Sequence, residues 1–403
     1  MDGEALQVAV DVGCRRHHAA IGNAQGRVLA EFEVEHTTAG FEDFFRRIEA
    51  QRRDDQQPVW VAMEGCNGYA RPLDQQVRAR GYRLLNINNL KLARFKELFP
   101  GPAKTDALDT HRMLELLRVQ AHVPLAKRIV QEVRGVPLAN AKLQRLTRRR
   151  RQLIAEKVRI VNRMQAELHA ACPGLLAITR SASSRWFLGL LACRDDLRQL
   201  ARLRSTTLRT IPRVGVKHAA IIAAWQRAAY FSEDVEWVGS MIIADARRIL
   251  ALLQEIQQLE KQITATAPAS QLYQRMTSVP GFGLVSCAEL AGEIGDHRRF
   301  DGEASLALYL GATSLDNTSG QQQGTKTARQ VNRRAKAALM NAVDHHRRGA
   351  VPASRVYYEK KRAQGKTHNQ AIRALARHMV RVLWSMFVHD RDYELRENPS
   401  HAT

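Results

Sequence analysis

Four acidic residues occupy positions where carboxylates can gather to bind a metal ion. Asp11 and Glu64 each follow a short apolar run that predicts a strand. In open sheets with parallel strands, functional groups gather at the carboxyl ends of the strands. Asp106 and Asp109 lie three residues apart at the start of a predicted helix, a spacing that puts both carboxylates on one face.

Four converging carboxylates would repel one another strongly unless a cation lay between them. Hard oxygen ligands select Mg²⁺, with Mn²⁺ as a substitute, and such an ion activates a nucleophile and stabilises a phosphate during transfer. Taken singly, these acids have simpler explanations: Asp106 as an acid that favours the start of a helix, Asp109 as its solvated neighbour and Glu64 as a charge at the end of a strand. Taken together, Asp11, Glu64, Asp106 and Asp109 predict a metal site.

A serine with basic neighbours is the second candidate for chemistry. Ser319-Gly320 lies in a polar loop, and the chain after it is rich in cations, at Lys326, Arg329, Arg333, Arg334 and Lys336. A hydroxyl attacks phosphorus when its proton is removed and cations meet the charge that grows on the phosphate oxygens. On local sequence alone, a solvated Ser-Gly turn before a nucleic-acid-binding helix remains the simpler interpretation.

The elements that must position the acids are read from the hydrophobic pattern. Apolar or alternating runs predict strands at Leu6–Val12, His17–Ile21, Arg27–Glu35, Pro58–Met63 and Tyr82–Ile87. Helical spacing predicts helices at Thr38–Arg53, Tyr69–Arg80 and Thr105–Arg118. The order βββαβαβα is typical of a ribonuclease-H-like mixed sheet covered by helices.

Beyond Pro124 the strand signals largely disappear and long helices are predicted, at Ala139–Ala171 and Val235–Thr266. The second helix has the 3-4 spacing of a coiled-coil seam, at Ile249, Leu252, Ile256, Leu259 and Ile263. The two helices could pair with each other or across a dimer. The basic run Arg148–Arg151 is most simply a solvated helix face or an RNA contact.

A weak internal repeat predicts two helix-hairpin-helix-like turns, Ile211-Pro-Arg-Val-Gly and Val279-Pro-Gly-Phe-Gly. Glycines in such a turn let the backbone approach a phosphate, while the next helix offers free N–H groups. A plain tight turn explains either copy alone. We expect a phosphate contact only in the second copy, which carries both Gly281 and Gly283.

The charge balance points to a polyanionic partner. Sixty-two Lys and Arg residues against forty Asp and Glu leave a formal charge of +22 on the 403-residue chain, which attracts nucleic acid. In the C-terminal region aromatic residues are interleaved with cations, Lys366 and Arg373 among them, so phosphates and unpaired bases are both expected ligands.

Cysteine usage and hydropathy bear on location. The five cysteines are scattered without a CxxC pair, which suggests neither zinc nor disulfides and fits a reducing cytosol. The first thirty residues do not resemble a signal peptide, and we find no run of 18 apolar residues. We therefore expect a cytoplasmic protein with no membrane span, associated with the nucleoid when it binds DNA.

These residues together resemble a known family, the DEDD transposases of bridge-RNA-guided insertion sequences, which includes the pilin-gene invertases. The N-terminal resemblance to their RuvC-like domain rests on three segments: Val10-Asp11-Val12, Glu64-Gly-Cys-Asn-Gly-Tyr69 and Lys104-Thr-Asp106-Ala-Leu-Asp109. The C-terminal resemblance rests on Ser278-Val-Pro-Gly-Phe-Gly283, Ser319-Gly320, Asn332-Arg-Arg and Gly365-Lys366. Val331 replaces a glycine common in relatives, and Gly13-Cys14-Arg15 also departs from the usual pattern.

The resemblance implies roles for these residues. Asp11, Glu64, Asp106 and Asp109 would bind Mg²⁺, and Ser319 would attack a DNA phosphodiester and hold the broken end as a phosphoserine ester. It further implies that a noncoding bridge RNA pairs with donor and target DNA. Domains of different protomers, in a dimer or a dimer of dimers, would form one composite site.

We therefore expect an α/β plus all-α transposase or recombinase with three regions. Residues 1–122 would form the RuvC-like domain, residues 123–270 a helical coiled-coil and dimerisation region, and residues 271–395 the serine-bearing domain. Two alternatives remain open. One is a metal-dependent nuclease of the Holliday-junction type that cuts with water, and the other is a non-catalytic nucleic-acid-binding protein.

Overall fold

The computed structural model describes residues 5–65, 68–98, 106–122, 129–318, 324–328, 331–349 and 351–395. The chain divides into two compact units, Met1–Gly135 and Val136–Thr403. Within the described ranges, no helix is both long enough and apolar enough to cross a membrane.

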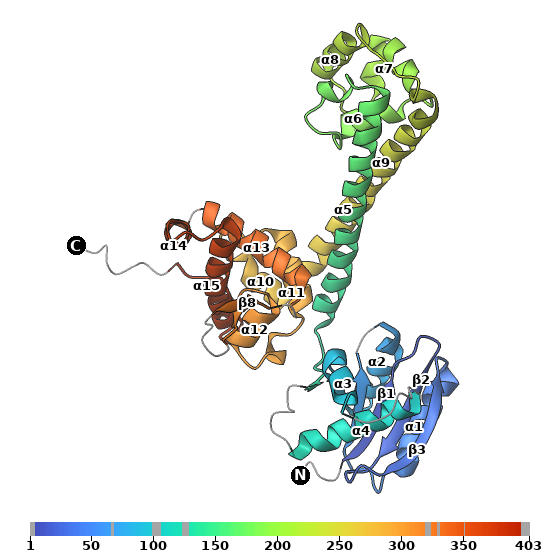
Figure 1. Ribbon diagram of the computed structural model, residues 1–403, viewed down its shortest axis with the longest axis vertical. Helices are drawn as coiled ribbons and strands as arrows, with labels where there is room; N and C mark the ends of the chain where they lie inside the picture. Colours follow the sequence, from blue (N-terminus) through green and yellow to red (C-terminus); the bar gives the residue numbers. More distant parts are fainter. Residues whose placement is uncertain are drawn as a thin grey trace, which may run out of the picture. The chain divides into compact units, whose positions relative to one another are not determined.

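The first unit contains a mixed six-stranded sheet with the strand order β3-β2-β1-β4-β5-β6 (Figure 1). Its strands are β1 (Leu6–Asp11), β2 (Arg16–Gly22), β3 (Val28–Glu35), β4 (Val59–Glu64), β5 (Arg83–Ile87) and β6 (Val130–Glu132). The first three form an antiparallel meander, β1, β4 and β5 are parallel, and β6 is antiparallel to β5. The predicted meander and mixed sheet are confirmed.

Helices cover both faces of this sheet because alternate side chains of a strand point to opposite faces. The helices are α1 (Thr38–Gln51), α2 (Arg71–Ala79), α3 (Asn89–Lys96) and α4 (Asp106–His122), with a 3-10 turn at Gly68–Ala70. Val8 and Val10 of β1 pack in one core with the aromatic residues of α1. Ala9, between them, packs in the other core with α4.

Two elements of this unit escaped the sequence-based prediction. Strand β6 is only three residues long, and it lies beyond Pro124, where we expected helices. Helix α3 has eight residues, of which only Leu92 is buried, so its periodic signal is weak. The omission of α3 matters for the site, because α3 ends at Lys96 beside the acidic residues.

A buried histidine gives this unit a predicted pH dependence. His17 on β2 is 1% exposed, and its Nδ1 lies 3.3 Å from His36 Nε2. Burial, and then the proximity of His36, lower the pKa of His17 to about 4. The folded unit therefore resists protonation that the unfolded chain accepts near pH 6.5.

As the pH falls from about 6.5 to 4, we expect the free energy of unfolding of this unit to decrease by up to about 3 kcal/mol. Below pH 4 both states carry the proton, so the loss from His17 stops there. The His17→Phe variant should show a flatter dependence of urea-denaturation midpoints between pH 7 and 4. An identical slope in the two proteins would contradict this assignment.

The second unit is helical apart from a two-stranded hairpin, within the part of it that the structure describes. Its long helices are α5 (Leu138–Ala171), α9 (Val235–Thr266), α13 (Arg333–Arg348), α14 (Pro352–Ala363) and α15 (His368–Val388). The shorter helices are α6 (Arg185–Ala192), α7 (Ser205–Thr210), α8 (Val216–Gln226), α10 (Gln271–Thr277), α11 (Leu284–Ile294) and α12 (Glu303–Tyr309). The hairpin strands are β7 (Ser314–Asp316) and β8 (Thr325–Thr327), and 3-10 turns lie at Leu176–Ile178, Leu197–Arg202, Ala267–Ala269 and His297–Arg299.

Helices α5 and α9 pair with each other in antiparallel directions (Figure 1). Arg150 Nε donates to Glu260 near one end of the pair, and Arg163 Nε donates to Asp245 nearer the other. Four of the five predicted seam residues of α9 are buried: Ile249, Leu252, Ile256 and Ile263. Of the two pairings we considered, the structure therefore shows the one within the chain.

Two separate cores lie along the α5–α9 pair. At one end of the pair, α6, α7 and α8 enclose one core with the neighbouring turns of α5 and α9 (Figure 1). At the other end, α10 to α15 enclose a second core, to which Leu143 of α5 contributes.

Candidate functional site

The four predicted metal ligands meet at one edge of the sheet in the first unit. Asp11 ends β1 and Glu64 ends β4, and these parallel strands are neighbours with Val10 paired to Met63. Asp106 and Asp109 occupy the first turn of α4, which packs on β1 and β2. After Glu64 the chain turns sharply at Gly65, whose φ of 90° is a left-handed conformation that favours glycine.

The negative charges of three of these acids act on the fourth, Asp11. The pKa of Asp11 is raised, first by burial and then by the negative charges of Asp106, Glu64 and Asp109, and Lys96 opposes the rise. Repulsion among ionised carboxylates is the reason such clusters require a cation. This effect on Asp11 is electrostatic support for the predicted quartet, because it requires the other three acids to lie near Asp11.

Lys96, at the end of α3, supplies positive charge inside this acidic cluster. Its Nζ lies 3.0 Å from Asp109 Oδ2 and 3.6 Å from Glu64 Oε2. The other carboxylate oxygen, Asp109 Oδ1, is buried and accepts no hydrogen bond within the described ranges, and Arg112 Nη1 lies 3.9 Å from it. A buried carboxylate oxygen without a hydrogen bond is costly, and it is the kind of atom that a bound cation would satisfy.

The donor set therefore suits a hard divalent cation, although the side chains do not yet converge on one point. Among the residues that the structure describes, no three acidic, histidine or cysteine side chains are arranged to hold a metal ion as they stand. The residue types nevertheless fit Mg²⁺ or Mn²⁺ chemically, because all four side chains are carboxylates. One oxygen of Asp109 accepts no hydrogen bond among the described residues, and the ammonium of Lys96 lies where a cation would bind.

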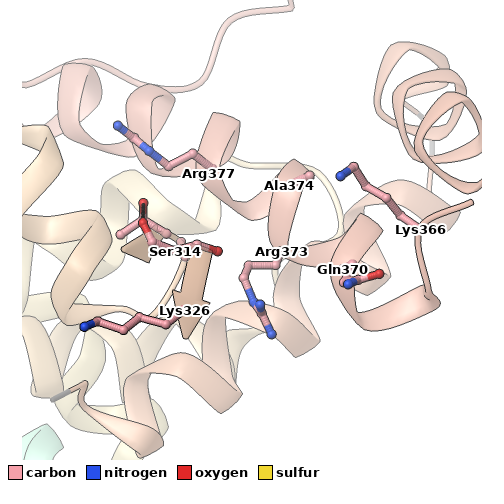
Figure 2. Close-up of a pocket in the computed structure, with 9 residues that line it drawn as sticks. Ser314, Lys326, Lys366, Gln370, Arg373, Ala374 and Arg377 are labelled. Carbon is pink, nitrogen blue, oxygen red and sulfur yellow. Dashed lines mark hydrogen bonds between the residues drawn. The ribbon is translucent and has the colours of Figure 1, made fainter. Parts of the chain in front are cut away.

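A basic cavity of about 400 Å³ lies in the second unit, beside the β7–β8 hairpin (Figure 2). Four cationic side chains line it, from Lys326, Lys366, Arg373 and Arg377, together with Ser314 and Gln370. No carboxylate is among the described residues that line it. The Nε atom of Arg373 is buried and has no hydrogen-bond partner in the described part of the chain.

The sequence-predicted cations thus fall into four groups. The structure brings Lys326, Lys366 and Arg373 together around the cavity, and Arg377 and Gln370 join them without having been predicted. Half-buried Lys336 lies near Arg373, and burial, with the charge of Arg373, lowers the pKa of Lys336. Arg333 and Arg334 are exposed at the start of α13, while Ser319 and Arg329 lie outside the described residues.

Gly281 and Gly283 lie in a tight turn between α10 and α11. A Cβ on Gly281 would come within 2.7 Å of the backbone of His346, so this glycine allows close packing of α13. A Cβ on Gly283 would meet nothing within 4 Å, and no side chain caps the helix that follows it. Gly283 is therefore the better candidate for a phosphate contact, which stays a prediction.

The Arg148–Arg151 run has a different role from the one we expected. Arg148 makes two hydrogen bonds, of 2.7 and 2.8 Å, to the carboxylate of Glu293, whose side chain is fully buried. Arg150 pairs with Glu260 and Arg151 with Glu289. Three of the four arginines thus hold the helices of the unit together, and the solvated-face interpretation was wrong for them.

Glu293 also connects α5 to the start of α13. Asn332 Nδ2 donates to Glu293 Oε2 over 2.7 Å, and Asn332 Oδ1 accepts from the backbone N–H groups of Arg334 and Ala335. Burial alone would raise the pKa of Glu293, but the hydrogen bonds from Arg148 and Asn332 outweigh it and hold that pKa below its ordinary value. The Asn-Arg-Arg motif is thus anchored by a buried ion pair.

Replacing Arg148 by alanine should leave the Glu293 carboxylate buried without its main partner. We expect the free energy of unfolding of the second unit to fall by about 3 kcal/mol. The neighbouring Arg149 is exposed, so Arg149→Ala should change it by no more than about 0.5 kcal/mol. Urea denaturation of the two variants measures the difference, and equal midpoints would contradict a structural role for Arg148.

Comparisons with known proteins match both ends of the chain. A transposase model of the DEDD, IS110 type matches residues 8–173, and a model described as transposase IS116/IS110/IS902 family matches residues 273–359. An insertion element IS110 protein of Streptomyces coelicolor is 29% identical, with 79% of each chain covered. An IS116 protein of Streptomyces clavuligerus is 27% identical over 95% of this chain and 94% of its own length. An IS900 protein of Mycobacterium paratuberculosis is 26% identical over 95% and 96%.

Proposed function

Because the chain belongs to the transposase family of the IS110 and IS116 insertion elements, we propose that it cuts and rejoins DNA through a covalent serine–phosphodiester intermediate. Ser319 is the proposed nucleophile, and Asp11, Glu64, Asp106 and Asp109 are the proposed ligands of Mg²⁺. The observation that carries the acidic half of the proposal is the placement of Asp11 and Glu64 at the ends of neighbouring parallel strands beside the first turn of α4, near enough that, after burial, the other three acids raise the pKa of Asp11.

In this proposal the first unit is a ribonuclease-H-like, RuvC-like metal domain. Its four carboxylates would hold a divalent ion, which when bound polarises a phosphate and stabilises the charge that develops on its oxygens. The strand order supports this assignment, because it sets Asp11 and Glu64 side by side at the carboxyl ends of two parallel strands.

The basic cavity supports the serine half of the proposal. Thr318, the last described residue before Ser319, follows strand β7, whose Ser314 lines the cavity. Arg377 is paired with Glu303, which leaves the other three cations of the cavity to meet the charge that the oxygens of a phosphodiester gain. Lys326, Lys366 and Arg373 would bind the scissile phosphate there, and Arg333 and Arg334 would contact phosphates farther along the strand.

The proposed step conserves the phosphodiester energy. The Ser319 hydroxyl loses its proton as its Oγ forms a bond to phosphorus, the bond from phosphorus to one sugar oxygen breaks, and that oxygen takes up a proton. The broken DNA end stays on the protein as a phosphoserine ester until the sugar hydroxyl of another strand reverses the reaction. No water is consumed, so rejoining needs no external energy source.

We further propose the partners that go with this chemistry. The formal charge of +22 supports binding of donor DNA, target DNA and a noncoding bridge RNA that selects both by base pairing. A homo-oligomer would let acidic and serine units of different protomers act on the same DNA. The turn at Gly283, a helix-hairpin-helix-like element, would add a backbone contact to phosphate.

One experiment tests the proposal directly. The purified full-length chain, its element's flanking transcript, donor DNA and Mg²⁺ are combined, and the products are separated on a denaturing gel. We expect a covalent protein–DNA adduct that mass spectrometry assigns to the peptide containing Ser319 and that EDTA abolishes. Cleaved DNA without an adduct would support the junction-nuclease alternative, and bound but uncleaved DNA would support a binding protein.

A further inference from the structure

Lys96 occupies a position that the proposed chemistry does not explain. It is the last residue of α3, and its side chain is only 18% exposed. Its Nζ contacts carboxylates from two different elements, Glu64 at the end of β4 and Asp109 in the first turn of α4. A lysine that merely covers a surface would keep its ammonium in water, whereas this one points into the acidic cluster.

The charge of Lys96 does part of what a metal ion would do. It ties Glu64 and Asp109 to a singly charged group instead of leaving both carboxylates free for a shared ion. Arg112 Nη1, 3.9 Å from Asp109 Oδ1, adds a second and more distant positive charge, and that oxygen accepts no hydrogen bond among the described residues. The positive charge is therefore closer to Asp109 Oδ2, at 3.0 Å, than to Asp109 Oδ1.

A divalent ion bound to these carboxylates would lie within a few ångströms of the ammonium. Like charges at that distance repel even where the effective dielectric constant is high. The ammonium of Lys96 and the incoming metal therefore compete for both Glu64 and Asp109, while Arg112 pairs only with Asp109 of these two acids. The arrangement also accounts for the failure of the four acids to converge as they stand.

We propose that Lys96 is an internal counter-ion that stabilises the metal-free acidic cluster and competes with the divalent ion for Glu64 and Asp109. The inference rests on the proposed metal site. Lys96 is a positioning residue in this proposal, because it acts through the two carboxylates. Lys96 would stabilise the four carboxylates in the folded protein before the metal binds. It would also make metal binding weaker and more reversible than it would be with the four carboxylates alone.

The test measures metal binding without any reaction. Mn²⁺ is titrated calorimetrically into the full-length wild type, Lys96→Met, Lys96→Arg and Arg94→Met, the last being a control from the same helix. We expect Lys96→Met to bind Mn²⁺ about tenfold more tightly than the wild type, because it keeps the side-chain length and loses the charge. Lys96→Arg and Arg94→Met should stay within about threefold of the wild type.

Thermal unfolding supplies a second readout. Without metal, Lys96→Met should unfold at a lower temperature than Arg94→Met, and added Mn²⁺ should stabilise it more. If Lys96→Met does not fold, Lys96→Gln carries the same expectation. The role of Lys96, but not the metal site, would be overturned if Lys96→Met and Lys96→Gln bound Mn²⁺ no more tightly than the wild type. Binding by Lys96→Arg as tight as that by Lys96→Met would overturn it too. No Mn²⁺ binding by any variant or the wild type would overturn both.

Discussion

Ser319→Ala is expected to form no covalent adduct with donor DNA and no strand-transfer product, while its affinity for DNA stays close to that of the wild type. Removing a nucleophile deprives the reaction of its first bond, and comparable removals in other enzymes lower the rate by at least about 10⁴-fold. The basic cavity and the rest of the cationic surface are unchanged in this variant, so binding should persist.

The matched comparison for this prediction is Ser314→Ala. Ser314 lines the basic cavity and is exposed, so it is the other serine that could reach a phosphate there. We expect Ser314→Ala to retain the adduct in the denaturing-gel assay. Loss of the adduct in Ser314→Ala with its retention in Ser319→Ala would move the nucleophile to Ser314. Loss of DNA binding in Ser319→Ala would contradict the prediction, because the substitution would then have damaged the fold or the DNA-binding surface.

Asp11→Asn is expected to lower the rate of strand cleavage on the order of 10³-fold while slightly stabilising the protein. A metal ion that stabilises transferred charge contributes several kcal/mol, and each 1.4 kcal/mol is about a tenfold change in rate. In the metal-free protein, however, burial and three neighbouring acids disfavour the ionised form of Asp11. A neutral asparagine removes that repulsion, so the melting temperature in EDTA should rise by about 2 °C.

The opposite signs of the two effects make this prediction specific. A substitution that merely damaged the fold would lower both the cleavage rate and the melting temperature. Asp55→Asn, an exposed residue on the loop after α1, should change neither. Wild-type recombination by a double variant, Asp11→Asn with Asp106→Asn, would remove the metal site from the mechanism and favour a non-catalytic role for the first unit.

The sequence predicted five of the six strands of the N-terminal sheet because each of those five carries a strong local signal. The alternation in β3 and the apolar runs of β1 and β4 are long enough to outweigh chance, and Asp11 and Glu64 sit at their ends. Strand β6 and helix α3 have three and eight residues, and such short segments show no clear period. Lys96 was missed for that reason, since its helix was not expected.

Long-range pairing set the second limit on what could be predicted. A run of arginines looks the same whether it faces solvent or a buried acid, and Glu293 lies far along the chain from Arg148. Arg377 and Gln370 of the cavity were missed similarly, because they are ordinary polar residues of α15 until the β7–β8 hairpin faces them. Local patterns identified the candidate groups, and tertiary packing decided which of them meet.

The contact between Arg148, Glu293 and Asn332 has a mechanical consequence. Helix α5 has 34 residues and is about 50 Å long, and Arg148, in its N-terminal third, is connected through Glu293 to Asn332, the N-cap residue of α13. A force applied at the C-terminal end of α5 would act with a long lever arm on that contact. It would either displace the start of α13 or break the ion pair between Arg148 and Glu293.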